Sequence, residues 1–332
     1  MSNRSIAAGA LIALAVAGLA PVQALAQSTI KVDGSSTVFP ITEAVAEEFQ
    51  KANRGVRVTV GISGTGGGFK KFCRGETDLS NASRPILKSE IDDCAKAGVQ
   101  YIEIPVAFDA LTVAVNPKNT WVSAITIAEL KKMWEPAAKG TVMKWKDVKA
   151  GWPDQPLKLY GAGADSGTFD YFTEAVTGKA KASRSDFTAS EDDNVLVTGI
   201  ENDRNALGFI PYAYFQPHAA KMKALAIDEG KGKGAVSPSE KTVVDGTYSP
   251  LSRPLFVYIN VKALDRAEVR NFLDFYLKSQ ALIKEVKYVA LPDQAYAIAR
   301  ERIAKKTVGT AFGGHPEVGL PILELLKREP KV

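Results

Sequence analysis

Histidine is almost absent from this chain of 332 residues, which holds only His218 and His315. Neither has a cysteine or carboxylate partner at a spacing typical of a metal site, so we expect no bound metal and no cofactor. No serine-containing turn reads Gly-x-Ser-x-Gly, and no histidine has a recognisable place beside one. The scarcity of histidine therefore argues against a hydrolase and favours a protein that is not an enzyme.

A concentrated positive charge is also missing. Lys and Arg number 42 against 37 Asp and Glu, and the net charge of +5 is spread over mixed-sign segments such as 131–135. A nucleic-acid-binding protein usually shows a stronger basic stripe interleaved with aromatic residues. We therefore expect no nucleic-acid partner.

Beyond the N-terminus, no stretch approaches the ~20 apolar residues that a membrane span needs. The N-terminus itself has Arg4, an apolar run at 6–19 and the small-x-small tripeptide Ala24-Leu25-Ala26. These are the three parts of a cleavable secretory signal. Because the run is short for the alternative, a transmembrane anchor, we predict export to the periplasm and cleavage after Ala26.

Cysteine is as scarce as histidine. Cys73 and Cys94 are the two cysteines, and they lie 21 positions apart. In an exported protein, an even pair predicts one disulfide. We expect it to be a structural link rather than a redox pair.

The chain does have three short turns rich in Gly, Ser and Thr, at 34–37, 61–68 and 163–168. Each follows a strand-like run and precedes a helix-like one. Such a turn directs backbone N–H groups and hydroxyls out of a helix N-terminus, where the helix dipole also favours an anion. Any one of them can be a plain helix cap or a flexible turn. Together they predict a site that binds a small oxyanion through hydrogen bonds.

Strand and helix patterns alternate along the chain. After a strand at 29–33, the first helix presents one apolar face made of Val38, Ile41, Val45 and Phe49. Alternation of this kind implies an α/β fold with mostly parallel sheets, whose ligands bind beyond the carboxyl ends of the strands. All three turns lie at that end of their strands.

The length is large for one core and suits two α/β lobes. We predict that residues 27–107 and 257–332 form the first lobe and residues 108–256 the second. Two strands would cross between the lobes, and the apolar runs 104–115 and 254–260 are the candidates for them.

Four motifs carry a likeness to a known family, and they lie at 32–40, 61–70, 81–85 and 165–169. In this order and at these separations they resemble the periplasmic phosphate-binding proteins of ABC-type phosphate uptake. The likeness covers nearly all of the chain after residue 26. It implies a two-lobed periplasmic-binding-protein fold, type II-like, that closes on inorganic phosphate and delivers it to a membrane permease. We expect the protein to be a monomer.

The resemblance also implies a set of ligands. In that family the hydroxyl of the residue matching Thr37 and the amide of the residue matching Val38 bind the anion. The position matching Thr65 contributes as well, although Ser63 lies so close that either hydroxyl can be the one used. The predicted phosphate-binding residues are Ser36, Thr37, Val38, Ser63, Gly64, Thr65, Arg84, Asp165, Ser166, Gly167 and Thr168.

Two positions depart from the family. Its best-known members have an aspartate where this chain has Arg84, and an arginine where it has Ala162. Arg84 can supply a bidentate, charge-assisted contact to the oxyanion. The missing aspartate is the acceptor expected to read the proton of hydrogen phosphate, which sulfate lacks. Asp165 is the candidate for this role; alternatively, it caps the following helix or pairs with Arg84.

Arg253 is a further cation with two possible roles, and the function has alternatives. Arg253 can reach a ligand, but we favour a structural ion pair near the hinge. A receptor for another tetrahedral oxyanion, such as sulfate or arsenate, is the alternative function. An exported hydrolase, or a structural protein that binds no anion, ranks lower.

Overall fold

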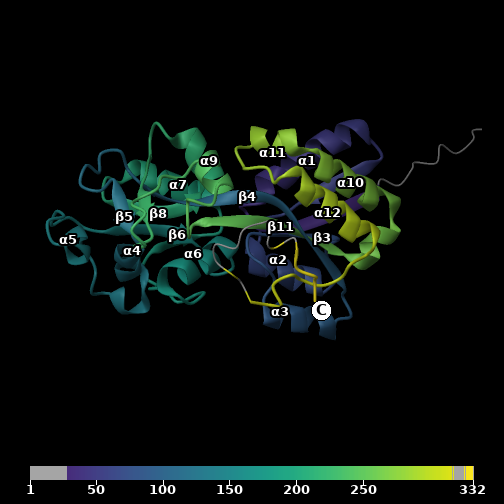
Figure 1. Cartoon of the computed structure of the whole chain (residues 1–332), viewed down its shortest axis with the longest axis horizontal. Helices are drawn as coiled ribbons and strands as arrows, with labels where there is room; N and C mark the ends of the chain where they lie inside the picture. Colours follow the sequence, from purple (N-terminus) through teal and green to yellow (C-terminus); the bar gives the residue numbers. More distant parts are fainter. Residues whose placement is uncertain (1–27, 316, 318–324, 326, 332) are drawn as a thin grey trace, which may run out of the picture.

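The computed structural model describes residues 28–315, 317, 325 and 327–331, and it has two lobes side by side (Figure 1). The predicted signal peptide lies outside the described residues. Over this part of the chain, the predicted α/β alternation of strands and helices is confirmed. No helix among the described residues is long and apolar enough to cross a membrane.

One sheet runs through both lobes. Its path among the described residues is β2-β1-β3-β11-β4-β8-β6-β7, and β9 pairs with β4 off this path. In the first lobe β1 pairs in parallel with β2 and with β3, and β11 is antiparallel to both β3 and β4. These strands are β1 (Ser28–Gly34), β2 (Val56–Val60), β3 (Leu79–Ala82), β4 (Tyr101–Val115) and β11 (Ser252–Asn260).

In the second lobe β8 is antiparallel to β4, and β6 is parallel to both β8 and β7. A separate parallel pair, β5 with β10, lies outside this sheet. The strands are β5 (Ala124–Thr126), β6 (Lys158–Ala162), β7 (Thr188–Ser190), β8 (Ala206–Pro211), β9 (Lys223–Ala224) and β10 (Ala226–Asp228).

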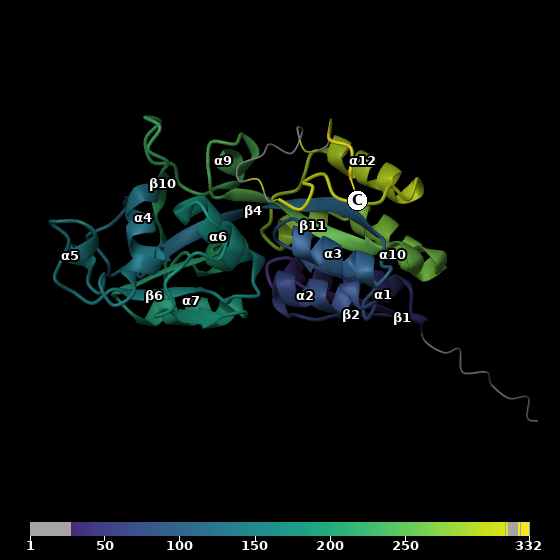
Figure 2. The ribbon, with the colours of Figure 1, turned by 90° about the horizontal axis from the view of Figure 1, so that it is seen from below.

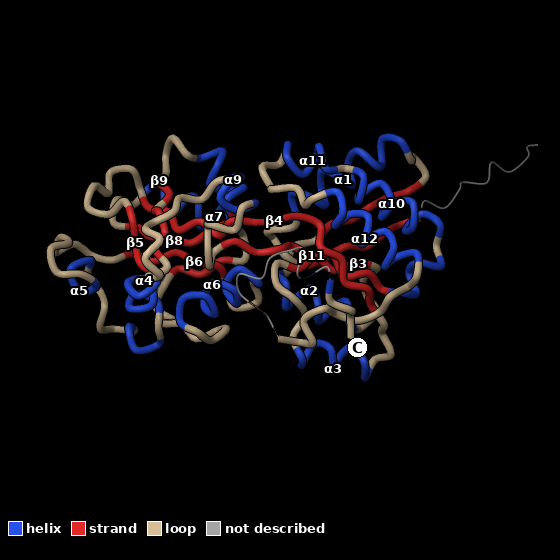
Figure 3. Tube along the Cα trace, viewed as in Figure 1, coloured by secondary structure: helices blue, strands red, loops and turns tan. Residues whose placement is uncertain are grey.

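The two long strands β4 and β11 join the lobes, and Figure 3 shows them running from one lobe into the other. Both are almost entirely buried. A strand covered on both faces needs apolar side chains on both, which explains why 104–115 is apolar on both faces apart from Asp109 and Thr112 rather than alternating.

Helices cover the sheet in each lobe. In the first lobe α1, α10, α11 and α12 lie on one side of β11, and α2 and α3 lie on the other (Figure 1). The view turned by 90° separates these helices from those of the second lobe (Figure 2). The first-lobe helices are α1 (Phe39–Ala52), α2 (Gly64–Cys73), α3 (Lys88–Lys96), α10 (Ala267–Lys278), α11 (Gln280–Glu285) and α12 (Asp293–Ala304). Those of the second lobe are α4 (Ile127–Trp134), α5 (Trp145–Val148), α6 (Gly167–Thr177), α7 (Asp193–Asn202), α8 (Tyr212–Phe215) and α9 (Glu240–Val244).

Each lobe has its own hydrophobic core. The core of the first lobe includes the predicted apolar face of α1, whose four side chains are all buried. The core of the second lobe surrounds the buried Trp134, which packs edge-on against Phe172 and Phe209. The division falls on β4 between Ala107, in the first core, and Ala110, in the second. The predicted lobe boundaries at 107/108 and 256/257 stay a prediction.

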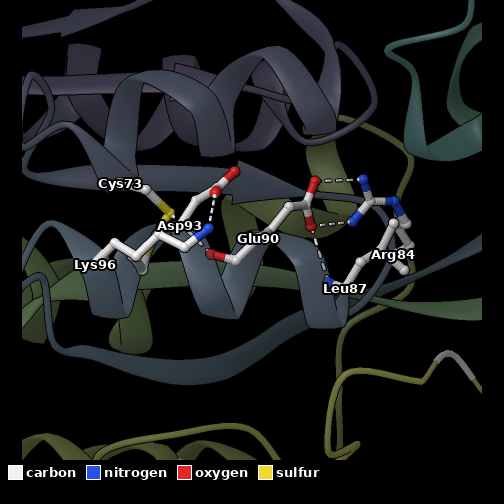
Figure 4. Close-up of a disulfide and its surroundings, with 7 residues drawn as sticks. Cys73, Arg84, Leu87, Glu90, Asp93 and Lys96 are labelled. Atoms are coloured by element: carbon white, nitrogen blue, oxygen red, sulfur yellow. Dashed lines mark hydrogen bonds and ion pairs between the residues drawn. A yellow bond between two sulfur atoms is a disulfide. The ribbon is translucent and has the colours of Figure 1, made fainter.

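The predicted disulfide between Cys73 and Cys94 is confirmed. It joins the last residue of α2 to α3, and Figure 4 shows it beside the ion pair of Asp93 with Lys96. The link therefore holds together two neighbouring helices of the first lobe, and the N-terminus of one of them, α2, faces the second lobe.

Replacing both Cys73 and Cys94 by alanine removes this link. We expect the free energy of unfolding to fall by about 3 kcal/mol, because the unfolded chain regains the freedom of a loop of this length. Urea unfolding followed by circular dichroism measures the change. A reductant should destabilise the parent protein and leave the double variant unaffected; equal stability of the two proteins without reductant would contradict the prediction.

Candidate functional site

The three turns predicted to bind an anion meet between the lobes. The hydroxyl of Thr37, from the turn before α1, lies 2.9 Å from the hydroxyl of Thr168 in the first turn of α6. From the turn that opens α2, the amide of Gly66 donates a 2.9 Å hydrogen bond to the carbonyl of Asp165. We call the residues that meet here the interlobe site: Ser36, Thr37, Val38, Thr65, Ser83, Gly167, Thr168 and Arg253.

The N-termini of α1, α2 and α6 all open on the interlobe site. At α1 the N-cap is Val38, and no side chain caps the helix. Neither Ser36 nor Thr37 caps the helix, because both hydroxyls bind residues of the second lobe instead. At α6 Ser166 is the N-cap and accepts a hydrogen bond from the Thr168 amide at 3.1 Å. Helix N-termini with free N–H groups and aligned dipoles attract anions.

Two glycines let the lobes approach closely. A Cβ atom on Gly167 would lie 2.5 Å from the Thr65 hydroxyl and 2.6 Å from the Ser83 hydroxyl. One on Gly64 would lie 2.5 Å from the Asp165 carbonyl, and Gly64 also has a φ of +73°. Any larger residue at these positions would push the lobes apart, so the glycines in these turns serve the contact between lobes.

Arg253 lies at the centre of the site, on the crossing strand β11. Its guanidinium binds the Asp109 carboxylate of β4 at 2.9 and 3.2 Å, and both side chains are buried. The favoured structural ion pair near the hinge is thus present. The same guanidinium also donates to the Thr168 hydroxyl at 2.8 Å and to the carbonyls of Ser83 and Gly167 at 3.0 and 3.1 Å.

Arg84 is buried between the lobes in a second ion-pair cluster. It makes a bidentate pair with Glu90 of its own lobe, both contacts being 2.8 Å (Figure 4). Its Nε donates to Asp170 of α6 at 2.5 Å, and another donor reaches the carbonyl of Pro85. The fork of this guanidinium is therefore occupied by carboxylates of the protein, and its contact to an oxyanion stays a prediction.

Asp165 faces a different partner from those expected. Its carboxylate is about half exposed and lies 3.2 Å from the ammonium of Lys70. It does not pair with Arg84, which binds Asp170, and Ser166 rather than Asp165 caps α6. Both structural alternatives for Asp165, the helix cap and the pair with Arg84, are wrong, and its role as a proton acceptor stays a prediction.

The choice between Ser63 and Thr65 is clearer in the structure. The Ser63 hydroxyl is hydrogen-bonded to Asp33 within the first lobe. The Thr65 hydroxyl lies 3.2 Å from the Ser83 hydroxyl and accepts the Ser83 amide at 3.1 Å, next to Gly167 of the second lobe. Thr65 is therefore the one of the pair that belongs to the interlobe site.

The comparisons with known proteins agree with this geometry. The chain matches the PBP superfamily domain over residues 20–280. Protein SphX of Synechococcus elongatus is 51% identical over 321 residues, covering 96% of this chain and 94% of that protein. Phosphate-binding protein PstS of Staphylococcus saprophyticus is 37% identical over 281 residues, covering 83% and 85%. The chain belongs to the PstS family of phosphate-binding proteins.

Two solved structures of phosphate-binding proteins share the fold of this chain. A possible phosphate-binding protein from Planctomyces limnophilus is 49% identical with a TM-score of 0.63, covering 84% of this chain and 98% of that one. A putative phosphate transporter substrate-binding protein from Clostridium perfringens shares the fold at 24% identity, with a TM-score of 0.67 and coverage of 80% and 100%. The predicted two-lobed fold is confirmed. PstS-family proteins bind substrates and are not enzymes, which also confirms that prediction.

Sequence reasoning missed several carboxylates of this PstS-family chain. Asp109, Asp170 and Asp193 are all buried between or beside the lobes. Asp193 is the first residue of α7 and accepts the Ser36 hydroxyl at 3.0 Å across the interface. The segment Ser190–Asn194 looks like an ordinary polar helix start, so no sequence signal separates Asp193 from the exposed Asp192 that caps the helix.

Asp193 is held in an environment that disfavours its charge. Burial, together with the nearby negative charge of Asp109, raises the pKa of the Asp193 carboxyl to about 7. The Ser36 hydroxyl and the Arg253 guanidinium lower the pKa of Asp193, but by less than burial and Asp109 raise it. In the part of the chain that the structure describes, no three His, Cys, Asp or Glu side chains are grouped to hold a metal ion.

Removing one partner of the Arg253–Asp109 pair should destabilise the protein strongly. Asp109→Asn leaves a buried guanidinium without its counter-charge, and we expect the free energy of unfolding to fall by about 3–5 kcal/mol. Urea unfolding measures it. The matched control is Lys70→Met, which breaks an exposed pair and should cost less than about 1 kcal/mol. A loss in Asp109→Asn as small as that of the control would show that the pair has no such role.

Proposed function

We propose that this chain is an exported receptor that binds inorganic phosphate between its lobes and delivers it to the permease of an ABC transporter. The observation that carries the proposal is the meeting of three helix N-termini around the Thr37 and Thr168 hydroxyls, with the buried Arg253 beside them. A small oxyanion with four oxygen acceptors matches such a set of donors.

The site offers hydrogen bonds more than net charge. Asp109 already offsets the charge of Arg253, so the attraction for the anion comes from hydroxyls, amides and helix dipoles. These donors sit at the N-termini of helices, and the Thr37 and Thr168 hydroxyls, which are 2.9 Å apart, must separate to admit the anion. Such a site can reach micromolar affinity or better, roughly −8 kcal/mol.

The ligands we propose come from both lobes. The hydroxyls of Thr37, Thr65 and Thr168 and the amides of Val38 and Gly167 are placed to donate to an anion held between them. No hydrogen bond from the amides of Val38 and Gly167 is formed with the described residues. Because donors come from both lobes, binding would also hold the lobes together.

The relatives and the N-terminus support the location and partners that we propose. The relatives include the phosphate-binding PstS proteins of Staphylococcus saprophyticus and Staphylococcus haemolyticus. We propose that residues 1–26 direct export to the periplasm and are removed, and that the mature chain works as a monomer.

Calorimetric titration of anion-stripped protein with phosphate tests the function. We expect one-to-one binding that survives excess sulfate. Thr168→Val should weaken phosphate binding about 10- to 100-fold, because it removes one hydrogen bond to a charged ligand. The control is Thr198→Val, which changes an exposed threonine of α7 and should leave the affinity unaltered.

The other outcomes separate the alternatives. Phosphate binding that sulfate abolishes would make the protein a receptor for tetrahedral oxyanions in general. Absence of heat with both anions would overturn the proposal.

A further inference from the structure

Three buried aspartates lie at the junction of the lobes, and one of them lacks a cation. Asp109 pairs with Arg253 at 2.9 Å and Asp170 with Arg84 at 2.5 Å. Asp193 forms no ion pair with any described residue. Its carboxylate accepts a single side-chain hydrogen bond within the described part of the chain, from the Ser36 hydroxyl at 3.0 Å. A buried carboxylate with so little compensation is expensive to keep ionised.

The groups around Asp193 come from several elements. Tyr214 of α8 donates from its hydroxyl to the carbonyl of Ser36 at 3.2 Å, which places a phenol beside the Ser36–Asp193 contact. The charged and titratable groups that interact most strongly with Asp193 include Asp109 of β4, Arg253 of β11, Asp192 at the start of its own helix, Tyr214 and Tyr288. The single cation among them is already bound to Asp109.

Asp193 is nevertheless close to the proposed anion ligands. Its partner Ser36 immediately precedes Thr37, whose hydroxyl meets that of Thr168. Arg253 contacts both of these hydroxyls and is also near enough to influence the Asp193 charge. The carboxylate thus lies at the edge of a site in which every other group of the proposed ligand set is a donor.

We propose that Asp193 determines anion selectivity by accepting a hydrogen bond from the P–OH group of bound hydrogen phosphate. The inference rests on the proposed function. Hydrogen phosphate supplies the donor that the carboxylate lacks, whereas sulfate carries no proton at neutral pH and would bring two negative charges together. Asp193 thereby replaces Asp165, whose half-exposed carboxylate already has Lys70 as a partner.

The experiment compares phosphate and sulfate affinities by calorimetry at pH 8 for the parent protein and Asp193→Asn. An asparagine of the same shape can donate to a fully ionised anion. We therefore expect phosphate binding to weaken at least about 10-fold while sulfate binding holds or tightens, so that the phosphate-to-sulfate ratio falls. The matched control is Asp192→Asn, an exposed neighbour at the same helix end, which should keep the ratio.

Two further variants test the role of Asp193 independently of Asp193→Asn. Ser36→Ala leaves the carboxylate in place but removes the hydroxyl that orients it, so the ratio should fall by a smaller factor; this variant decides the matter if Asp193→Asn does not fold. Asp165→Asn tests the rival residue, and we expect the ratio to be kept.

Several results would overturn the assignment. Equal weakening of phosphate and sulfate in Asp193→Asn would mean that Asp193 only holds the lobes together. An unchanged ratio would mean that it does not read the ligand, or that it is protonated and donates to either anion. Loss of selectivity in Asp165→Asn alone would assign the role to Asp165. If the parent protein binds neither anion, the proposed function itself fails, which is a different result from any of these.

Discussion

The structure depends on a buried ion pair at the place where the chain crosses between its lobes. Arg253 of β11 and Asp109 of β4 are paired at 2.9 Å, and the remaining donors of the guanidinium reach Ser83 of one lobe and Gly167 and Thr168 of the other. The pair is expensive to desolvate unless nearly all of its hydrogen-bonding capacity is used. Because the partners come from both lobes, that condition is met when the lobes are together.

The lobes meet through backbone as much as through side chains. Two glycines bring the turns of α2 and α6 into contact, and the N-termini of α1, α2 and α6 face one region. The positive ends of three helix dipoles converge here, and they repel one another slightly. An anion between them removes that repulsion, so ligand binding and lobe closure favour each other.

Local patterns in the sequence were enough to predict the turns, the apolar face of α1 and the alternation of strands and helices, because each depends on residues near one another in the chain. The disulfide was predictable because the chain has two cysteines and thus one possible internal pair. Pairings between charged residues that lie far apart in the sequence could not be predicted. Arg84 looks like a free cation for an anion, yet its partners Glu90 and Asp170 are set by how α3 and α6 pack. Asp193 is indistinguishable from a capping residue until α7 is placed against the turn before α1. What could not be predicted is therefore the environment of charged residues whose partners lie far away in sequence.

The double crossing of the chain has a consequence for the order of folding. The core of the second lobe is built from one continuous stretch, apart from Val289, whereas that of the first lobe joins residues 30–107 to residues 255–325 and includes Ala213. Contacts that are close in sequence form sooner than those that wait for a distant partner. In the proposed export, which delivers the N-terminus first, the leading strands must wait for β11, the last strand of the sheet among the described residues, while the middle of the chain can already be compact. The lobe that begins first is thus the one that finishes last.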